Sequence, residues 1–233
     1  MVKQWLKHWQ HWRGQREDKI RPWQENSYLV LDMETTGLDP KQHQVISLGW
    51  VLIENGAIQL DTAQHLLLDS AEIDDESVGI HMITDADVLE QGRRHASVLR
   101  YLRQIMKDKV LVAHYAPLEL GFLKSLWQTQ PMPALSLHWL DTMQIEMQRR
   151  ARAQEVIQEG GYRLGPCRER YGLPEYPGHD ALTDAMATAE LLLAQMAHYN
   201  HHDPSLQALL RTGGGRVRLA THKRITPDIK KPN

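Results

Sequence analysis

The sequence predicts an α/β domain built on a mixed or parallel sheet. Short apolar runs, which are typical of buried strands, alternate along the chain with segments whose apolar residues recur at helical spacing. Clusters of turn-forming residues separate many of these segments. The chain has 233 residues, of which 42% are hydrophobic, and this length is enough to bury a substantial core.

Five apolar runs predict the strands. The first of them is apolar on both faces, as expected of a central buried strand, and turn-forming residues end it at 35–40. The others have the same short, apolar character and are bounded by polar or turn residues. The expected strands cover residues 28–31, 45–53, 57–60, 110–113 and 135–140.

Helical periodicity predicts the elements between and after these strands. Pro117 stands just before one of them, where a proline suits the first helical turn. A further short helix is expected after Pro204, and the three glycines at 213–215 predict a hinge before the tail. No Gly-Lys-Ser/Thr follows them, so they do not form a phosphate-binding loop. The expected helices cover residues 97–106, 118–127, 141–157, 163–171 and 181–198.

We expect three parts in the chain. Residues 1–26 comprise an amphipathic helix rich in tryptophan and a connector, residues 27–200 form the main domain, and residues 201–233 form a short helix and a Gly-hinged basic tail. The tryptophans either pack the first helix onto the domain or present a surface to a partner, a nucleic acid or a membrane surface.

Charge is distributed unevenly along the chain. Residues 1–26 carry a net charge of +3 and residues 211–233 carry +6, whereas residues 27–210 carry −11. An acidic body between basic ends suggests divalent cations in the middle and a polyanion near the ends. The tail is either a solvated terminus or a contact for phosphates, and phosphate binding would weaken steeply with salt.

Composition excludes several classes of protein. No apolar run approaches the roughly 18 residues that a membrane-spanning helix requires, so we expect no integral membrane protein. The first residues lack the apolar core and the cleavage site of an export signal. A single cysteine, Cys167, rules out an internal disulfide and a cysteine-based zinc site. We therefore expect a cytoplasmic protein.

Asp32 and Glu34 are the first candidates for chemistry. They follow the apolar run at 28–31, and residues two apart on a strand point to the same face. Two adjacent carboxylates repel each other unless a cation or a proton joins them. Oxygen ligands of this kind favour Mg²⁺ or Mn²⁺, although an Asp-x-Glu pattern alone is common.

Two further segments place acids at the start of a predicted helix. In His179-Asp-Ala-Leu-Thr-Asp184-Ala, the second aspartate would lie in the first turns of a helix with small residues, which can lie close to a sheet. In His114-Tyr-Ala-Pro-Leu-Glu119, the glutamate falls in a first helical turn, where its charge suits the helix dipole. Each segment alone has an ordinary structural explanation.

Taken together, the three segments resemble the motifs of the DnaQ-type DEDDh 3′–5′ exonucleases, over roughly residues 27–198. Tyr-Leu-Val-Leu-Asp-Met-Glu-Thr-Thr-Gly-Leu-Asp-Pro at 28–40 is similar to the first motif, and residues 179–185 are similar to the histidine form of the third. His81-Met82-Ile-Thr resembles a further family element. The resemblance implies an RNase H-like exonuclease fold, with a mixed sheet of about five strands flanked by helices.

The second motif departs from the family pattern. Relatives usually read His-Asn-Ala-x-Phe-Asp, whereas this chain has Tyr115, Leu118 and Glu119 at the Asn, Phe and Asp positions. The longer carboxylate could still serve, because in relatives this aspartate reaches the metals partly through water. The departure bears on the rate, the metal preference and the grip on the terminal nucleotide.

The resemblance implies a set of site residues and two divalent metal ions, Mg²⁺ or Mn²⁺. Asp32, Glu34 and Asp184 would bind metal with Glu119 completing the acidic cluster, and His179 would take a proton from the attacking water. The products would be nucleoside 5′-monophosphates. By the same resemblance, the residues lining the terminal nucleotide would be Met33, Thr35, Thr36, Leu38, His81, Met82 and Leu118.

Several alternatives stay open at this point. The expected partner is a nucleic acid 3′ end, preferably single-stranded DNA, but the same chemistry on RNA or on short oligoribonucleotides would use the same residues, because sugar discrimination depends on the 2′ position. A non-catalytic adapter with a degraded second motif is the alternative from another class. The sequence leaves open a polymerase or repair partner and the choice between monomer and dimer.

Overall fold

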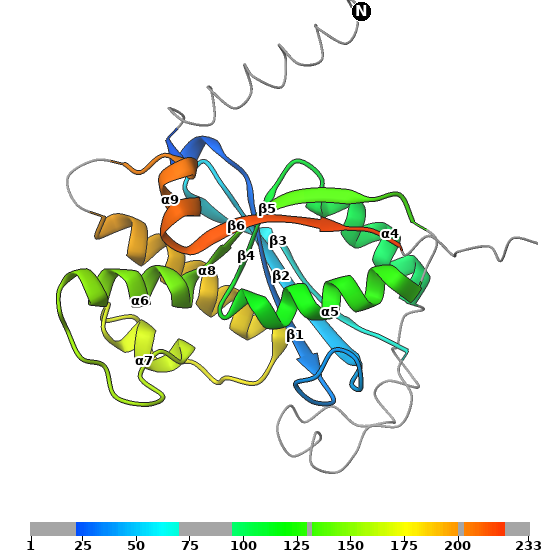
Figure 1. Cartoon of the computed structure of the whole chain (residues 1–233), viewed down its shortest axis with the longest axis horizontal. Helices are drawn as coiled ribbons and strands as arrows, with labels where there is room; N and C mark the ends of the chain where they lie inside the picture. Colours follow the sequence, from blue (N-terminus) through cyan, green and yellow to red (C-terminus); the bar gives the residue numbers. More distant parts are fainter. Residues whose placement is uncertain (1–21, 70–94, 130–131, 200–202, 222–233) are drawn as a thin grey trace, which may run out of the picture.

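The computed structural model describes residues 22–69, 95–129, 132–199 and 203–221. These residues form one mixed six-stranded sheet in the order β3-β2-β1-β4-β5-β6, with helices on both faces (Figure 1). The strands are β1 (Tyr28–Thr35), β2 (Val45–Glu54), β3 (Ala57–Leu67), β4 (Val110–Ala113), β5 (Leu135–Asp141) and β6 (Gly214–Leu219).

The observed helices confirm most of those that the periodicity of the sequence predicts. A single 3-10 turn, η1 (Trp23–Glu25), precedes β1. The α-helices among the described residues are α4 (His95–Met106), α5 (Ala116–Thr129), α6 (Thr142–Arg152), α7 (Leu164–Glu169), α8 (Ala181–Ala197) and α9 (Leu206–Gly213). None of these helices is both long enough and apolar enough to cross a membrane.

Strand directions bring three chain segments to one edge of the sheet. β1 runs parallel to β4, and β4 runs parallel to β5, whereas β2, β3 and β6 pair antiparallel with their neighbours. The carboxyl ends of β1, β4 and β5 therefore lie at the same edge. The loop after β1, the start of α5 and the start of α6 follow directly from that edge, where α/β proteins place their sites.

β1 separates two apolar clusters. Leu29 and Leu31 belong to the cluster that contains residues of α4 and α5, whereas Tyr28 and Val30 belong to the cluster that contains residues of α8 and α9. Figure 1 shows these two helix pairs on opposite sides of the sheet. The strand is thus buried on both faces, as its uninterrupted apolar run predicts.

The expected hinge at residues 213–215 is wrong. Gly213 ends α9, and the next two glycines begin β6, where Gly214 pairs with Leu140 and Gly215 with Trp139. A Cβ atom on Gly214 would overlap the carbonyl oxygen of Trp139. These glycines therefore permit a close approach of β6 to β5 rather than loosening the chain, and the sheet has six strands instead of about five.

Some predictions concern residues outside the described part of the chain. These are the amphipathic helix within residues 1–21, the tail beyond Thr221, and the two substrate-contact candidates His81 and Met82. The three-part division of the chain stays a prediction, apart from the hinge.

Candidate active site

The alternation of β1 brings Asp32 and Glu34 to the face of the sheet that α8 covers. In the antiparallel ladder Asp32 pairs with Gly49 and Glu34 pairs with Ser47. A Cβ atom at Gly49 would overlap the backbone of the first residues of α8, Ala181 and Leu182. The glycine therefore lets the amino-terminal turn of α8 rest directly on the sheet, beside Asp32.

This contact completes a carboxylate cluster. One oxygen each from Asp32, Glu34 and Asp184 lies within 4.8 Å of the other two, and all three side chains are partly buried. Three carboxylates this close require a bound cation or protons to offset their repulsion. Their oxygen ligands suit Mg²⁺ or Mn²⁺, so the cluster fits the metal site that the sequence predicts.

Glu119 joins the cluster from the first turn of α5. Its side chain is 3% exposed, and its Oε2 atom is buried with no hydrogen-bond partner. After burial itself, the charge of Glu119 is the largest cause that raises the pKa of Asp32 well above its ordinary value. Glu119 therefore faces Asp32 with an oxygen free to bind a ligand, although it is outside the group of three whose oxygens meet within 4.8 Å.

The electrostatics of the site favour a cation or bound protons. Burial, and then the charges of Asp184 and Asp180, raise the pKa of Glu34 to about 7. Burial raises the pKa of Glu119 to about 8, and it also raises the pKa of Asp184 despite a hydrogen bond from the backbone of His179. The protein thus gathers carboxylates whose ionised forms repel one another, and a divalent ion at this position would relieve that repulsion.

His179 lies on the segment that leads into α8. Its backbone has a positive φ of 70° and its N–H donates to Oδ2 of Asp184 at 3.1 Å, while its side chain is exposed. Asp180 then caps α8 by accepting from the N–H of Thr183 at 2.8 Å. The imidazole is thus attached to a backbone that Asp184 itself fixes, next to the carboxylates and open to solvent.

Asp141 is a site-shaping residue for which the sequence alone gave no role. Its buried carboxylate accepts four backbone N–H groups, two from the start of α6 and two from Tyr115 and Ala116 at the start of α5. It thereby fixes the helix that carries Glu119. An aspartate directly before a helix is an N-cap signal. Its hydrogen bonds to the start of α5, however, join Asp141 to residues 25 and 26 positions earlier in the sequence.

His114 begins the second motif and has a structural role. Its Nε2 atom lies 2.9 Å from the carbonyl oxygen of Tyr162 and its Nδ1 atom lies 2.8 Å from the hydroxyl of Thr142. Burial lowers the pKa of His114 to about 4, so the neutral ring donates through Nε2 and accepts at Nδ1. Both nitrogens are engaged, and the ring holds the loop before α7 against β4 and α6.

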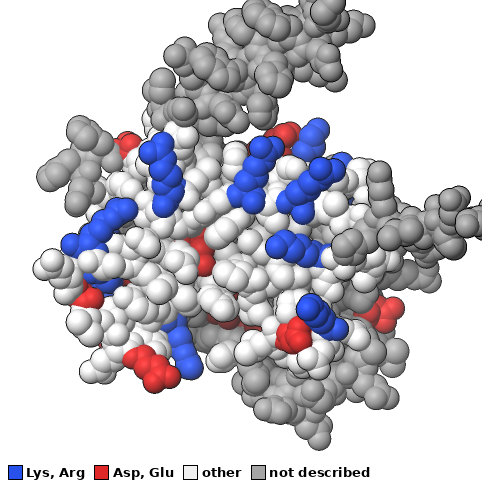
Figure 2. Space-filling model, in the orientation of Figure 1, with Lys and Arg blue, Asp and Glu red and all other residues white. Residues whose placement is uncertain are grey.

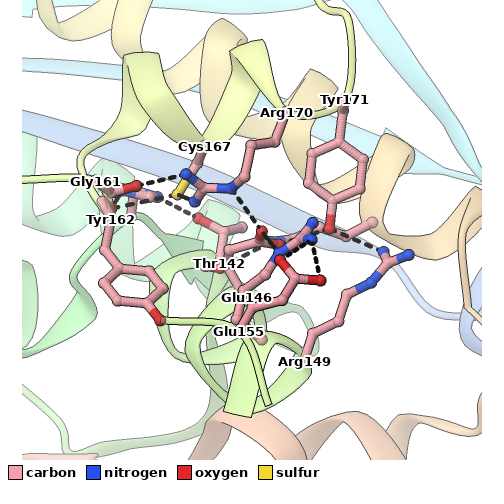
Figure 3. A network of polar contacts seen from close by, with 12 residues as sticks. Thr142, Glu146, Arg149, Glu155, Gly161, Tyr162, Cys167, Arg170 and Tyr171 are labelled. Carbon is pink, nitrogen blue, oxygen red and sulfur yellow. Dashed lines mark hydrogen bonds and ion pairs between the residues drawn. The ribbon is translucent and has the colours of Figure 1, made fainter. Parts of the chain in front are cut away.

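A buried network joins α6 to α7 (Figure 3). Oε1 of Glu146 accepts from Nε of Arg150 at 2.7 Å and from Nε of Arg170 at 3.0 Å, and Oε2 accepts from the hydroxyl of Tyr171 at 2.6 Å. Burial alone would raise the pKa of Glu146, but these donors lower it below its ordinary value. The network joins Glu146 of α6 to Arg170 and Tyr171, which follow directly after α7.

The predicted substrate contacts differ in their placement. Thr35 is the last residue of β1 and Thr36 begins the turn that follows it. The hydroxyl of Thr35 donates to the carbonyl of Gly37 at 2.8 Å, and the N–H of Thr36 donates to the carbonyl of Gln44 at 2.9 Å. Leu38, in the same turn, is 76% exposed. This turn presents an exposed apolar side chain shortly after Glu34 in the sequence.

Met33 and Leu118 belong at least partly to the core. The side chain of Met33 is 6% exposed and packs in the cluster with α4 and α5, on the opposite face of β1 from Asp32. Alternation along the strand turns this side chain away from the carboxylates, so the structure gives the predicted substrate contact of Met33 no support. Leu118 is half-buried and packs at the edge of the same cluster.

Comparison with known proteins identifies the family. The family model for an exonuclease, RNase T, matches residues 29–192, which include all four carboxylates and His179. The chain belongs to this exonuclease family. Its predicted membership of the DnaQ-like exonucleases is thereby confirmed.

Curated relatives of this exonuclease are much longer than the chain. It is 34% identical over 171 residues to a DNA polymerase III PolC-type from Thermotoga maritima, an alignment that covers 72% of the chain and 12% of that protein. It is 28% identical over 168 residues to the corresponding protein of Streptococcus pneumoniae, with 72% and 11% covered. The chain thus spans about an eighth of the length of these relatives.

Solved structures confirm the fold. Exonuclease X in complex with 5′ overhanging duplex DNA has a TM-score of 0.59 and 22% identity, with 80% of this chain and 99% of that chain covered. Cell-death related nuclease 4 has a TM-score of 0.61 and 18% identity, with 75% and 64% covered. E. coli exonuclease I in complex with a dA16 oligonucleotide has a TM-score of 0.58 and 14% identity, with 74% and 41% covered. The RNase H-like exonuclease fold is thus confirmed.

Proposed function

We propose that this exonuclease hydrolyses DNA from single-stranded 3′ ends and releases nucleoside 5′-monophosphates one at a time, using two divalent ions. The observation that carries the proposal is the convergence of Asp32, Glu34 and Asp184 within 4.8 Å. These residues come from β1 and α8, which are about 150 residues apart in the sequence, in a chain of an exonuclease family. Convergence of this kind provides a metal site at a strand end.

The carboxylates would hold the two ions, Mg²⁺ or Mn²⁺. Asp32, Glu34 and Asp184 would bind them directly, and Glu119 would contribute its buried oxygen beside Asp32. Two ions at this position would neutralise the charge of the phosphate and stabilise the entering and leaving oxygens. The carboxylates themselves have the second task of fixing the position of the scissile phosphate at the end of β1.

His179 is the residue that would accept the proton of the attacking water. Its exposed imidazole stands on a backbone that donates to Asp184, so its position follows that of the carboxylates. Histidine is the side chain best suited to take a proton near neutral pH. His114 does not compete for this role, because both of its ring nitrogens have partners.

DNA is the substrate that the comparisons favour. Exonuclease X and E. coli exonuclease I, two of the structural neighbours, are described in complexes with DNA. RNA is the second candidate, because the carboxylates would contact only the scissile phosphate and discrimination would depend on contacts to the 2′ position. A non-catalytic adapter is disfavoured by the assembled cluster, whose repulsion would serve no purpose in a protein that only binds a partner.

Digestion of end-labelled oligonucleotides tests the proposal. Matched DNA and RNA strands, each labelled at the 5′ or the 3′ end, would be incubated with Mg²⁺, with Mn²⁺ or with a chelator. We expect mononucleotides to be released from the 3′ end of DNA, and a chelator should stop their release. Release from 5′ ends, or an unchanged rate with the chelator, would refute the polarity or the metal requirement.

Two substitutions separate the roles of the residues. Asp184→Asn should abolish Mn²⁺ binding and activity, whereas His179→Ala should keep Mn²⁺ binding and slow turnover about 10²–10⁴-fold. Asp108→Asn is the matched control, because Asp108 is exposed in a turn with a positive φ of 61° that asparagine also adopts. The curated relatives are polymerases, so replicative polymerase subunits are the first partners to test, by gel filtration.

A further inference from the structure

A cavity of about 400 Å³ lies where the ends of α6 and α8 meet α9. Sites for small molecules commonly have volumes in this range. The described residues that line the cavity include none of the four carboxylates and not His179. α6 has 11 residues and begins directly after Asp141, at the edge of the sheet that carries the candidate active site. At a rise of 1.5 Å per residue its far end lies roughly 15 Å along the helix from that edge.

Three arginines near the end of α6 line this cavity, and they differ in their partners. Arg150 donates to Glu146 at 2.7 Å and to Glu155 at 2.8 Å, so its charge is neutralised. Arg149 instead donates to the uncharged hydroxyl of Tyr171 at 2.9 Å, and its guanidinium carbon lies 5.3 Å from the centroid of the tyrosine ring (Figure 3). Tyr171 thus holds this guanidinium in place without neutralising it.

Arg152 is exposed and has no acidic partner among the described residues. Arg149 and Arg152 are three positions apart on α6, so their side chains are neighbours on the helix surface, where like charges repel each other. Three arginines and one glutamate, Glu155, give the wall of the cavity a net charge of +2. A phosphate monoester carries a charge of about −1.5 to −2 at neutral pH, and it would offset both the charge and the repulsion.

The rest of the wall suits a nucleoside. His198 and Tyr199 line the cavity where α8 ends, and planar bases stack on aromatic rings of this kind. Gln195 also lines the cavity and is 1% exposed. Its Nε2 donates to the carbonyl of Thr142 at 2.8 Å, whereas its Oε1 is buried without a hydrogen-bond partner. A buried acceptor without a donor is costly, and an N–H group of a base would supply the donor.

We propose that this cavity is a second site, which binds a nucleoside 5′-monophosphate. Arg149 and Arg152 bind the phosphate, and the wall formed by Gln195, His198 and Tyr199 binds the nucleoside. The ligand belongs to the class of compound that the active site would release. The inference therefore rests on the proposed function for the source of the ligand, but binding itself requires no catalysis.

Isothermal titration of the full chain with deoxyadenosine 5′-monophosphate, in the presence of a chelator, tests the proposal. Without divalent ions the carboxylate cluster repels a phosphate, so the heat of binding reports on the second site. Arg152→Gln removes an exposed charge and should weaken binding about 10-fold with the unfolding temperature unchanged. Arg100→Gln is the matched control, because Arg100 is exposed on α4, whose core contacts lie on the opposite face of the sheet from those of α6. The control should bind as tightly as wild type.

Three further ligands test the chemistry of the site. These are deoxyadenosine, inorganic phosphate, and a single-stranded oligonucleotide with hydroxyl groups at both ends. Each lacks either the phosphate monoester or the nucleoside, so each should bind more weakly than the mononucleotide. Equal affinity for any of the three would overturn the proposal, because the cavity would then not recognise a nucleoside and a phosphate monoester together.

The outcomes distinguish this inference from the function on which it rests. If the mononucleotide does not bind, or binds to Arg152→Gln as tightly as to wild type, the second site is refuted, and the proposed function stands if labelled DNA is still digested. If binding depends on Arg152 but DNA is not digested, the proposed function is refuted and the nucleotide site stands.

Discussion

Gly49→Ala is the change that most directly tests how the site is assembled. The added Cβ atom would overlap backbone atoms of Ala181 and Leu182, which cannot rotate away as a flexible side chain can. α8 must therefore move off the sheet. The helix packs against the sheet through the fully buried Ala185 and Ala189, so a shift at its start also disturbs its packing.

Both stability and activity should fall. An added methyl group in a filled core costs up to about 3 kcal/mol, which corresponds to a decrease in unfolding temperature of roughly 6–12 °C for a chain of this size. Displacement of Asp184 from Asp32 by even about 1 Å should reduce turnover about 10²-fold. Exonuclease turnover on a 3′-labelled strand and Mn²⁺ affinity would be measured with thermal denaturation on the same samples.

Gly165→Ala is the control for this experiment. Gly165 lies in α7, and a Cβ atom there would meet nothing within 4 Å. Alanine is the better helix former by up to about 1 kcal/mol, so this variant should be as active as wild type and slightly more stable. Gly49→Ala with wild-type turnover would show that α8 does not depend on contact with the sheet at this glycine, and would refute the reasoning.

Three further predictions concern the surroundings of the site. Asp141→Ala leaves four backbone N–H groups without their acceptor, so thermal denaturation should show a loss of about 3 kcal/mol or more, and Asp141→Asn should lose less. Arg216 and Arg218 are exposed in β6, where Figure 2 shows Lys and Arg side chains gathered over this part of the molecule. If they contact phosphates, replacing both by glutamate should weaken DNA binding. The slope of log affinity against log salt concentration should decrease in magnitude by about 2, and an unchanged slope would exclude the contact. In metal-free protein the folded-state pKa values of Glu34, about 7, and Glu119, about 8, exceed the unfolded value of about 4.3. The folded state then binds more protons than the unfolded state between about pH 4.5 and 8, so the free energy of unfolding should fall as pH rises through this window and recover when Mn²⁺ is added.

The carboxylates of β1 could be predicted because their arrangement is local. A period of two along a strand places Asp32 and Glu34 on one face whatever the rest of the fold does. The same alternation turns the Met33 side chain to the opposite face, where it is buried. Asp184 required the resemblance of the motifs, because no local pattern shows which helix rests on which strand.

Tertiary contacts explain what the sequence could not show. Three consecutive glycines predict flexibility when only local conformation is considered, but at Gly214 the missing side chain makes room for the carbonyl of Trp139 in β5. Asp141 caps α6 through local contacts, whereas its attachment to the start of α5 depends on β4 and β5 being neighbours. Such contacts join residues far apart in the chain, and local propensity carries no information about them.

The reach of Glu119, which stands in place of the expected aspartate, depends on the same contacts, and this dependence can be tested. The start of α5 is fixed because Asp141 accepts from the N–H groups of Tyr115 and Ala116, so the length of the side chain determines how far its carboxylate reaches toward Asp32. Glu119→Asp withdraws that carboxylate by about 1.5 Å, one carbon–carbon bond. Although this change restores the usual residue of the motif, we expect weaker Mn²⁺ binding and turnover lower by about 10²-fold. Glu119→Gln keeps the length but removes the charge, and should lose Mn²⁺ affinity while gaining stability in metal-free protein at pH 8, because the repulsion with Asp32 is gone. If Glu119→Asp were as active as wild type, the start of α5 would have to move by the missing bond length, and Asp141 would not be the residue that fixes it.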